Sequence, residues 1–367
     1  MEKINLIFFI PQFILGGEGK SITSLCKNIN KKNFKISIIC MNKCYYKKDL
    51  GKFCKIYELP TRRALFAQNK VSNIIKKTIM GNKKNIFISS LFYSNALSAI
   101  FQKKYENLRF LFMERTAFKE LYGYFSITDF VKKNIIKLIL KLFYKKADIV
   151  VANSKKVADE IKKFSNVNTT HIYPGSFKMV KIKKKKINQP IRIIAIGRLT
   201  EEKGFDVLIN ALKNIDKKKF NLSIIGDGYL KQKIYNLIKK NDLTKNVELL
   251  GPKKNVMKYI MKSDLLVNPS YFEGFPNVVI EALTCGTPII CSKSHGGIYE
   301  ILRNQKYGDL FENGNPASLE NKIQKFIKNP NRLIKKSKNG QLDLERFSQK
   351  ISAEKYENIF YKLWKNH

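Results

Sequence analysis

The sequence is poor in acidic residues. It contains 29 Asp and Glu against 70 Lys and Arg, which gives a formal net charge of +41. A charge this far from neutral favours anionic partners, namely nucleic acid, an anionic membrane leaflet or phosphorylated substrates. Lys, Ile and Asn are all abundant, as expected of an AT-rich genome, so a solvated basic surface is the alternative reading of the same charge.

Residues that bind metals are also scarce. The chain has three His and six Cys, and none of the Cys forms a C-x-x-C pair. A zinc site therefore cannot be assembled, and there is no D-x-D motif for a divalent metal. We expect no metal and no cofactor, and reduced, mostly buried thiols in a cytoplasmic protein. The cysteines are Cys26, Cys40, Cys44, Cys54, Cys285 and Cys291.

Long hydrophobic runs are absent. No stretch reaches the roughly 18 to 20 apolar residues that span a bilayer. The segment 86–101 comes closest, but its Ser and Asn residues favour a buried strand and helix. The N-terminal apolar run is short, is interrupted by Pro11 and precedes no small-x-small cleavage site, so we predict no signal peptide.

Short apolar runs typical of strands alternate with longer amphipathic segments, which predicts parallel α/β sheets covered on both faces. The segment 176–190 breaks this pattern because it is dense in charge and ends in Pro190, so we interpret it as a linker. The sequence thus predicts two tandem doubly wound, Rossmann-like domains that face each other across a cleft, with ligands at the carboxyl ends of strands. The predicted strands are NLIFFI, KISIICM, IFISSLF, RFLFME, ADIVVANS, IRIIAIG, FNLSIIG, NVELLG, DLLVNPS and TPIICS.

The first glycine-bearing turn, ILGGEGKS, follows the first predicted strand. A P-loop needs glycine five residues before Gly19, but that position is Ile14, so we exclude a Walker A site. The remaining hypothesis is that Gly16 and Gly17 open a helix whose N-terminus faces the cleft and can approach a phosphate.

Two further turns follow strands of the second half. In GRLTEEKG, Arg198 and Lys203 suit a diphosphate, because an Arg guanidinium can bind two oxygens at once and a Lys ammonium acts as a point charge. The alternative is a pair of surface cations. In GDGYL, Gly226 and Gly228 begin a dinucleotide fingerprint that Lys231 leaves incomplete, so we do not predict NAD.

The segment 268–290 carries two glutamates, Glu273 and Glu281, with seven residues between them. Glu273 is predicted on a loop, and Glu281 early in a helix whose first position suits Pro276. The carboxylates could accept hydrogen bonds from ligand hydroxyls while amides at the positive helix end take a phosphate. The alternative is a capping loop followed by a helix-surface glutamate.

At these residues the chain resembles glycosyltransferase family 4, the retaining nucleotide-sugar transferases of GT-B fold. The resemblance rests on Glu273 and Glu281 in SYFEGFPNVVIEALTCGTPII, and on GRLTEEKG, GDG, ELLG and GGIYEIL. It covers nearly the whole chain and is most specific from 190 to 310. It implies an acceptor-side domain over 1–175, a nucleotide-sugar domain over 191–348 and a final helix, 349–367, that crosses back to the first domain.

The resemblance also implies roles for individual residues. Arg198 and Lys203 would hold the donor diphosphate and stabilise the leaving group, and Glu273 would contact the donor sugar. These three form the predicted catalytic set. Retention would come from front-face attack, with the leaving phosphate taking the acceptor proton. The predicted donor-binding residues are Gly16, Gly17, Gly197, Gly226, Gly228, Gly274, Phe275, Pro276, Asn277 and Glu281, with Glu281 at the ribose hydroxyls.

The chain departs from the family at FLFMERTAF. Many relatives carry a His there that reaches the cleft, whereas this chain has Glu114 and Arg115. A similar Glu-Arg pair occurs in relatives that extend lipid-diphosphate-linked glycans with N-acetylhexosamines. We therefore predict Glu114 and Arg115 as acceptor-side residues, with a salt-bridged strand end as the alternative.

The segment 128–148 is predicted to form a helix with lysines on much of one face. Its apolar residues recur at three and four spacing and are Phe130, Val131, Ile135, Leu138, Ile139, Leu142 and Phe143. One interpretation is an ordinary core-facing helix. The other is a basic amphipathic helix that lies on an anionic leaflet or binds a lipid diphosphate.

Taken with these patterns, the resemblance implies a retaining, metal-independent hexosyltransferase. It would move a hexose or N-acetylhexosamine from a nucleotide sugar, with UDP as the expected base, to a lipid-linked glycan in bacterial surface polysaccharide, lipopolysaccharide or glycoprotein glycan assembly. We expect it to be peripheral on the cytoplasmic face of the inner membrane. The alternatives are an epimerase or non-transferring nucleotide-sugar binder on the same scaffold, and a nucleic-acid-binding protein. We expect no nucleic acid partner, because the basic runs lack interleaved aromatics and any recognisable nucleic-acid module.

Overall fold

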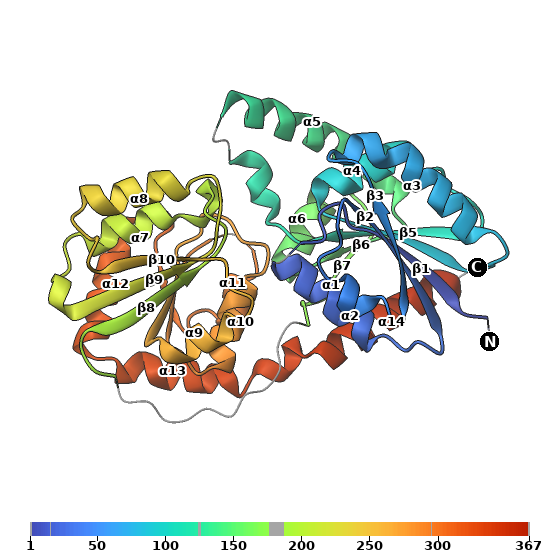
Figure 1. Cartoon of the computed structure of the whole chain (residues 1–367). Helices are drawn as coiled ribbons and strands as arrows, with labels where there is room; N and C mark the ends of the chain where they lie inside the picture. Colours follow the sequence, from blue (N-terminus) through green and yellow to red (C-terminus); the bar gives the residue numbers. More distant parts are fainter. Residues whose placement is uncertain (1, 15, 124–125, 176–186, 295, 366–367) are drawn as a thin grey trace. The chain divides into compact units, whose positions relative to one another are not determined.

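The computed structural model describes the chain except for residues 1, 15, 124–125, 176–186, 295 and 366–367. The chain divides into two compact units. The first unit is Met1–Ser176 with Phe347–His367, and the second unit is Phe177–Arg346. Each unit has its own parallel sheet with helices on both faces (Figure 1). Most of the predicted linker, 176–186, lies outside the described residues.

The first unit is built on a seven-stranded sheet in the order β3-β2-β1-β4-β5-β6-β7, and all neighbouring strands pair in parallel. The order reverses between β1 and β4, which makes this point the topological switch of the sheet. The sequence predicted neither β3 nor β7, since β3 is an edge strand with charged residues and β7 has only three residues. The strands are β1 Ile4–Phe9, β2 Phe34–Met41, β3 Cys54–Leu59, β4 Asn85–Ser90, β5 Leu108–Glu114, β6 Ile149–Ala152 and β7 Thr169–His171.

The helices of the first unit cover both faces of this sheet. Helices α3 to α6 share one hydrophobic core, and α1, α2 and α14 share the core on the opposite face (Figure 1). The bounds are α1 Gly17–Asn28, α2 Lys47–Leu50, α3 Ala64–Ile79, α4 Phe92–Phe101, α5 Ile127–Phe143, α6 Lys155–Ser165 and α14 Gln349–Lys365, with 3-10 turns η1 Phe118–Tyr122 and η2 Tyr144–Lys146.

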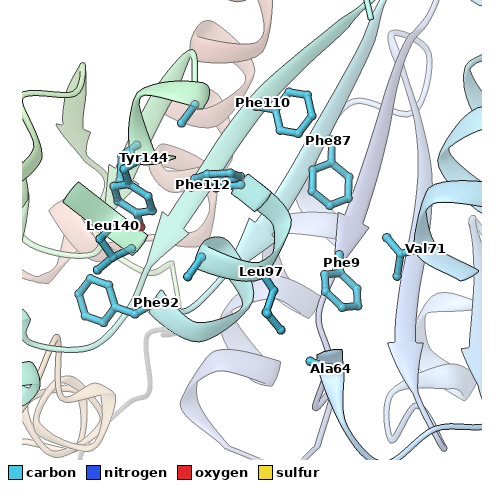
Figure 2. Close-up of a cluster of buried hydrophobic side chains, with 14 of the residues drawn as sticks. Phe9, Ala64, Val71, Phe87, Phe92, Leu97, Phe110, Phe112, Leu140 and Tyr144 are labelled. Atoms are coloured by element: carbon cyan, nitrogen blue, oxygen red, sulfur yellow. The ribbon is translucent and has the colours of Figure 1, made fainter. Parts of the chain in front are cut away.

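Aromatic side chains from adjacent strands form the centre of one core (Figure 2). The register pairs Phe87 of β4 with Phe110 of β5, and their ring centroids are 5.5 Å apart. Phe112 lies on the same face of β5 as Phe110, and its ring centroid is 5.5 Å from that of Tyr144. Each such side chain contributes roughly 1.5–3 kcal/mol on full burial, so this cluster holds the central strands side by side.

The last helix, α14, packs on the first unit. Phe360 is fully buried, and its ring lies 5.7 Å from that of Phe34. Glu357 accepts a hydrogen bond of 2.7 Å from the backbone N–H of Asn30. The C-terminal segment therefore completes a core that begins with the first strands.

The second unit has a six-stranded parallel sheet in the order β10-β9-β8-β11-β12-β13, which reverses between β8 and β11. The sequence missed β13, which has three residues and begins with Asp309, a buried carboxylate paired with Lys336 at 2.7 Å. The strands are β8 Ile191–Ile196, β9 Phe220–Ile225, β10 Val247–Gly251, β11 Leu265–Asn268, β12 Ile289–Ser292 and β13 Asp309–Phe311.

Helices α7, α8 and α12 pack on one face of the second sheet, and α9 and α10 lie on the other (Figure 1). Within the described residues of the whole chain, none of the helices combines the length and apolarity that a membrane crossing requires. The bounds are α7 Phe205–Leu212, α8 Lys231–Lys240, α9 Met257–Lys262, α10 Asn277–Thr284, α11 Ile298–Ile301, α12 Pro316–Lys328 and α13 Asn331–Gln341, with 3-10 turns η3 Glu201–Lys203, η4 Lys217–Lys219 and η5 Leu344–Phe347.

Candidate active site

The candidate site of the second unit lies at the carboxyl ends of β8 and β11. These strands are neighbours in the sheet, and the strand order reverses between them. Crossovers that leave a sheet in opposite directions at such a point create a crevice above the strand ends, where α/β proteins bind their ligands. The residues that the sequence singled out follow these strands: 197–203 come after β8, and 273–281 span the loop after β11 and the first part of α10.

An ion pair joins these two loops. The Lys203 Nζ lies 2.7 Å from Glu273 Oε1, and the side chains are only 19% and 12% exposed. Ser270 donates a second hydrogen bond, of 2.8 Å, to the same carboxylate oxygen. The structure therefore brings two predicted residues together and adds Ser270, for which the sequence carried no signal beyond its place on the loop.

Arg198 is placed differently from Lys203. Its side chain is 71% exposed, and its guanidinium lies 2.9 Å from Glu202. An exposed pair of this kind contributes little to stability, so the guanidinium is free to exchange one anionic partner for another. The Glu202 backbone carbonyl also accepts a hydrogen bond from the Tyr271 N–H at 2.9 Å, which again links the β8 and β11 loops.

The predicted glycines after β8 and β9 allow two loops to approach closely. A Cβ added at Gly226 would lie 1.8 Å from the Gly197 carbonyl oxygen, and Gly226 has a φ of 151°. A Cβ at Gly228 would lie 2.4 Å from the Leu199 carbonyl oxygen. Gly226 and Gly228 thus have a packing reason to be glycine, whatever ligand the loops hold.

Helix α10 begins at Asn277, and Pro276 is its N-cap rather than its first residue. Glu281 is the fifth of the eight helical residues and is 7% exposed, so the alternative of a helix-surface glutamate is wrong. Burial and the nearby Glu281 carboxylate raise the pKa of Cys285 to about 12. Phe275 is buried next to this helix start.

The loop after β12 holds the Glu273 backbone in place. A Cβ added at Gly296 would lie 1.7 Å from the Glu273 carbonyl oxygen, and Gly296 has a φ of 110°. The Gly297 N–H donates a hydrogen bond of 2.8 Å to the Gly274 carbonyl. The sequence showed these two glycines only as part of GGIYEIL and assigned them no role in the site.

The first unit gathers polar residues at its own switch point, between β1 and β4. Helix α1 begins at Gly17, with Gly16 as its N-cap. Glu18, in the first turn of α1, accepts a hydrogen bond from the Ser90 hydroxyl at the end of β4. The predicted helix N-terminus is therefore present, and it carries a carboxylate beside the two glycines.

Glu114 is fully buried at the end of β5. Its Oε1 accepts hydrogen bonds from Asn95 Nδ2, at 2.7 Å, and from the Tyr144 hydroxyl, while its Oε2 has no partner among the described residues. Burial raises the pKa of Glu114 well above its ordinary value, and the Glu18 charge adds to this effect. A carboxyl in this position does not suit direct contact with an acceptor.

Arg115 contacts residues other than Glu114. Its Nη1 donates to the Ser21 hydroxyl of α1 at 2.9 Å, and its carbonyl accepts a hydrogen bond of 2.7 Å from Asn153. No ion pair joins Glu114 and Arg115, so the alternative of a salt-bridged strand end is wrong. Arg115 is half-buried, and it remains the acceptor-side candidate of the two.

The comparisons with known proteins agree with this architecture. The family described as Glycosyl transferases group 1 matches residues 178–343. Anabaena HepE, whose crystal structure contains UDP and glucose, has a TM-score of 0.78 at 17% identity over 98% of this chain and 100% of that one. The chain therefore has the GT-B fold, as the resemblance predicted, and its residues 178–343 are similar to the group 1 glycosyl transferases.

Two sequence relatives extend the comparison. An uncharacterized glycosyltransferase of Methanocaldococcus jannaschii is 37% identical over 48% of this chain. The chain thus spans about half (47%) of that relative's length. A Campylobacter jejuni protein is 27% identical over 90% of this chain and 93% of its own length. It is named N-acetylgalactosamine-N,N'-diacetylbacillosaminyl-diphospho-undecaprenol 4-alpha-N-acetylgalactosaminyltransferase.

The Gly296→Ala substitution should disrupt the site, because the new Cβ collides with the Glu273 backbone. We expect a clearly lower Tm in a thermal melt, because the loop after β12 must move to relieve the collision. The matched control is Gly251→Ala, where φ is 67° but no atom lies within 4 Å of the added Cβ. Equal Tm values for Gly296→Ala and Gly251→Ala would contradict the contact.

The Glu114→Gln substitution should stabilise the first unit at pH 8 by on the order of 1–2 kcal/mol. As the pH rises above 4.5, the ordinary pKa, the unfolded chain loses this proton before the folded chain does, so wild-type stability falls with pH. Urea unfolding followed by the single tryptophan, Trp364 on α14, measures this difference. Glu106→Gln, a substitution at an exposed position, is the control. A Glu114→Gln protein less stable than wild type at pH 8 would contradict the raised pKa of Glu114.

Proposed function

We propose that the chain is a retaining, metal-independent glycosyltransferase. In this proposal it moves a hexose or N-acetylhexosamine from a UDP-sugar to a lipid-linked glycan at the cytoplasmic face of the inner membrane. The observation that carries the proposal is the Lys203–Glu273 pair at the switch point of the second unit. A cation and a carboxylate in one shielded site match the phosphates and hydroxyls of a nucleotide sugar.

Lys203 is assigned to the donor diphosphate. The diphosphate is already anionic in the donor, and it gains further negative charge as it leaves. A preorganised cation therefore stabilises the leaving diphosphate more than the bound donor. The Nζ is 2.7 Å from Glu273 and can shift from the carboxylate to a phosphate oxygen. Arg198, exposed and paired with Glu202, adds a second cation, and the positive end of α10 adds a dipole in the same region.

The two glutamates are assigned to hydroxyl groups. Glu281 would accept hydrogen bonds from the ribose, and Glu273 from the donor sugar. Glu273 is held by Ser270 and by the glycine loop at Gly296, so its oxygens keep a defined position. Charge-assisted hydrogen bonds to a shielded carboxylate are stronger than bonds between neutral groups, which favours this use of two acids in a basic chain.

The donor and acceptor classes are supported by the neighbours. HepE was solved with UDP and glucose, and the name of the C. jejuni relative specifies a diphospho-undecaprenol acceptor. In the first unit, the α1 N-terminus with Ser90 and Arg115 is assigned to the acceptor side. Retention is assigned to front-face attack, in which the leaving phosphate takes the acceptor proton.

A radiolabel transfer assay tests the proposal. Purified protein is incubated with labelled UDP-, GDP- or ADP-sugars and a bacterial lipid extract, in the presence and in the absence of EDTA. The Glu281→Ala protein is assayed in parallel. We expect label to enter the organic phase from a UDP-sugar, to persist in EDTA and to fall about tenfold in Glu281→Ala through weaker donor binding. Label that stays with every donor would contradict transfer to lipid, and an isomerised donor would favour the epimerase alternative.

The Lys203→Ala substitution should lower kcat by roughly 100-fold with a small change in Tm, because the lost cation acts on the leaving group. The matched control is Lys213→Ala, an exposed lysine at the end of α7. Steady-state kinetics and a thermal melt separate the two effects. Wild-type turnover in Lys203→Ala would refute the assigned role.

A further inference from the structure

Helix α5 exposes most of its apolar side chains. Only Ile136 and Leu140 of α5 are buried, and they provide its contact with the core. On a surface helix the apolar stripe normally faces the core, so a second apolar face turned to solvent requires an explanation. The exposed side chains are Ile127, Phe130, Val131, Ile135, Leu138, Leu142 and Phe143, of which Leu138 is 58% exposed.

The exposed face continues onto α4. Tyr93, Ile100 and Phe101 of α4 are also exposed, and α4 packs directly against α5 in the first unit (Figure 1). A groove of about 500 Å³ runs between the two helices, with an almost entirely apolar lining. Its lining includes Tyr93, Ala96, Leu97, Ile127, Thr128, Val131, Lys132, Ile135, Ile136 and Ile139. We call this surface, formed by the exposed side chains of α4 and α5 and their groove, the α4–α5 face.

Positive charge borders the α4–α5 face. Helix α5 carries four lysines, Lys132, Lys133, Lys137 and Lys141, against a single acidic residue, Asp129. Lys132 lines the groove, and its Nζ lies 5.4 Å from the ring centroid of Tyr93. Lys and Tyr side chains each have an apolar body and a polar end, so both suit the boundary between hydrocarbon and lipid headgroups.

This charge favours one occupant over the others. A second copy of the chain would bring two lysine-bordered faces together around a twofold axis, which is repulsive. Nucleic acid would satisfy the lysines but leave the apolar side chains without a partner. An anionic bilayer offers phosphates to the lysines and hydrocarbon to the apolar residues.

We propose that the α4–α5 face docks on an anionic lipid bilayer and that its groove takes a hydrocarbon chain of a lipid. Side chains 127–139 extend over roughly 18 Å of helix at 1.5 Å per residue, long enough to lie along one chain. The inference deepens the proposed function, on which it rests for placing the chain at a membrane. Vesicle binding nevertheless tests it without any sugar transfer.

Vesicle co-sedimentation is the first test. Wild-type protein should bind vesicles of phosphatidylglycerol and phosphatidylcholine, bind pure phosphatidylcholine at least about tenfold more weakly, and lose binding at high salt. The double substitution Ile135→Glu, Leu138→Glu should weaken binding by about tenfold or more. Both side chains are exposed, so the substitutions leave the core of the first unit intact. Leu342→Glu is the matched control, because Leu342 is 87% exposed and lies in the second unit.

The groove is tested by fluorescence. In a Trp364→Phe background, Ile135→Trp should be quenched by vesicles whose lipid chains carry bromine, whereas Leu342→Trp should not. Equal quenching at both positions, or none at position 135, would overturn the groove as a chain site.

Two results would overturn the docking surface itself. One is no binding to anionic vesicles at low salt. The other is a dimer in sedimentation equilibrium that Leu138→Glu dissolves, since a second copy would then cover the face. Transfer to a detergent-solubilised acceptor separates the two proposals. If the Ile135→Glu, Leu138→Glu protein still transfers sugar but no longer binds vesicles, the result supports docking. If the wild type binds vesicles but transfers no sugar, the result contradicts only the proposed function.

Discussion

The parallel pairing of β8 with β11 is the constraint on which the candidate site depends. Leu265 and Leu266 pair with Ile193 and Ile194, and both strands end beneath the loops that carry the site. Lys203 and Glu273 are 70 residues apart in the sequence, yet this pairing brings their side chains to 2.7 Å. A slip of one residue would turn the buried leucines to the opposite face of the sheet, so core packing also holds the register of the ion pair.

The first unit places its polar residues by the same constraint. Its switch point lies between β1 and β4, where Glu18 meets Ser90 and Arg115 reaches back to Ser21 on α1. Crossovers diverge there, and the strand ends leave room for polar groups that a closed core would exclude. Glu18 in the first unit and Glu273 in the second thus place one carboxylate at each switch point.

The strands were largely predictable from the sequence. Every predicted apolar run became a strand, because a short, near-continuous apolar run suits a sheet buried on both faces. The missed strands β3, β7 and β13 are short or bear charges such as Glu58 and Asp309, so their pairing partners rather than their own composition make them strands. For helix α5 the periodicity showed an apolar stripe but not on which side the core would lie.

The sequence by itself determined the α/β class, the order of the elements, the loops that carry Arg198, Lys203 and Glu273, and the helix that carries Glu281. These features depend on local periodicity and on glycines next to strand ends, which a linear pattern displays. Only the tertiary structure decided that Lys203 pairs with Glu273, that Glu114 is buried with a raised pKa, and that α5 keeps an apolar face in solvent. Each of these depends on contacts between segments far apart in the chain, and burial and partner choice exist only once those segments pack.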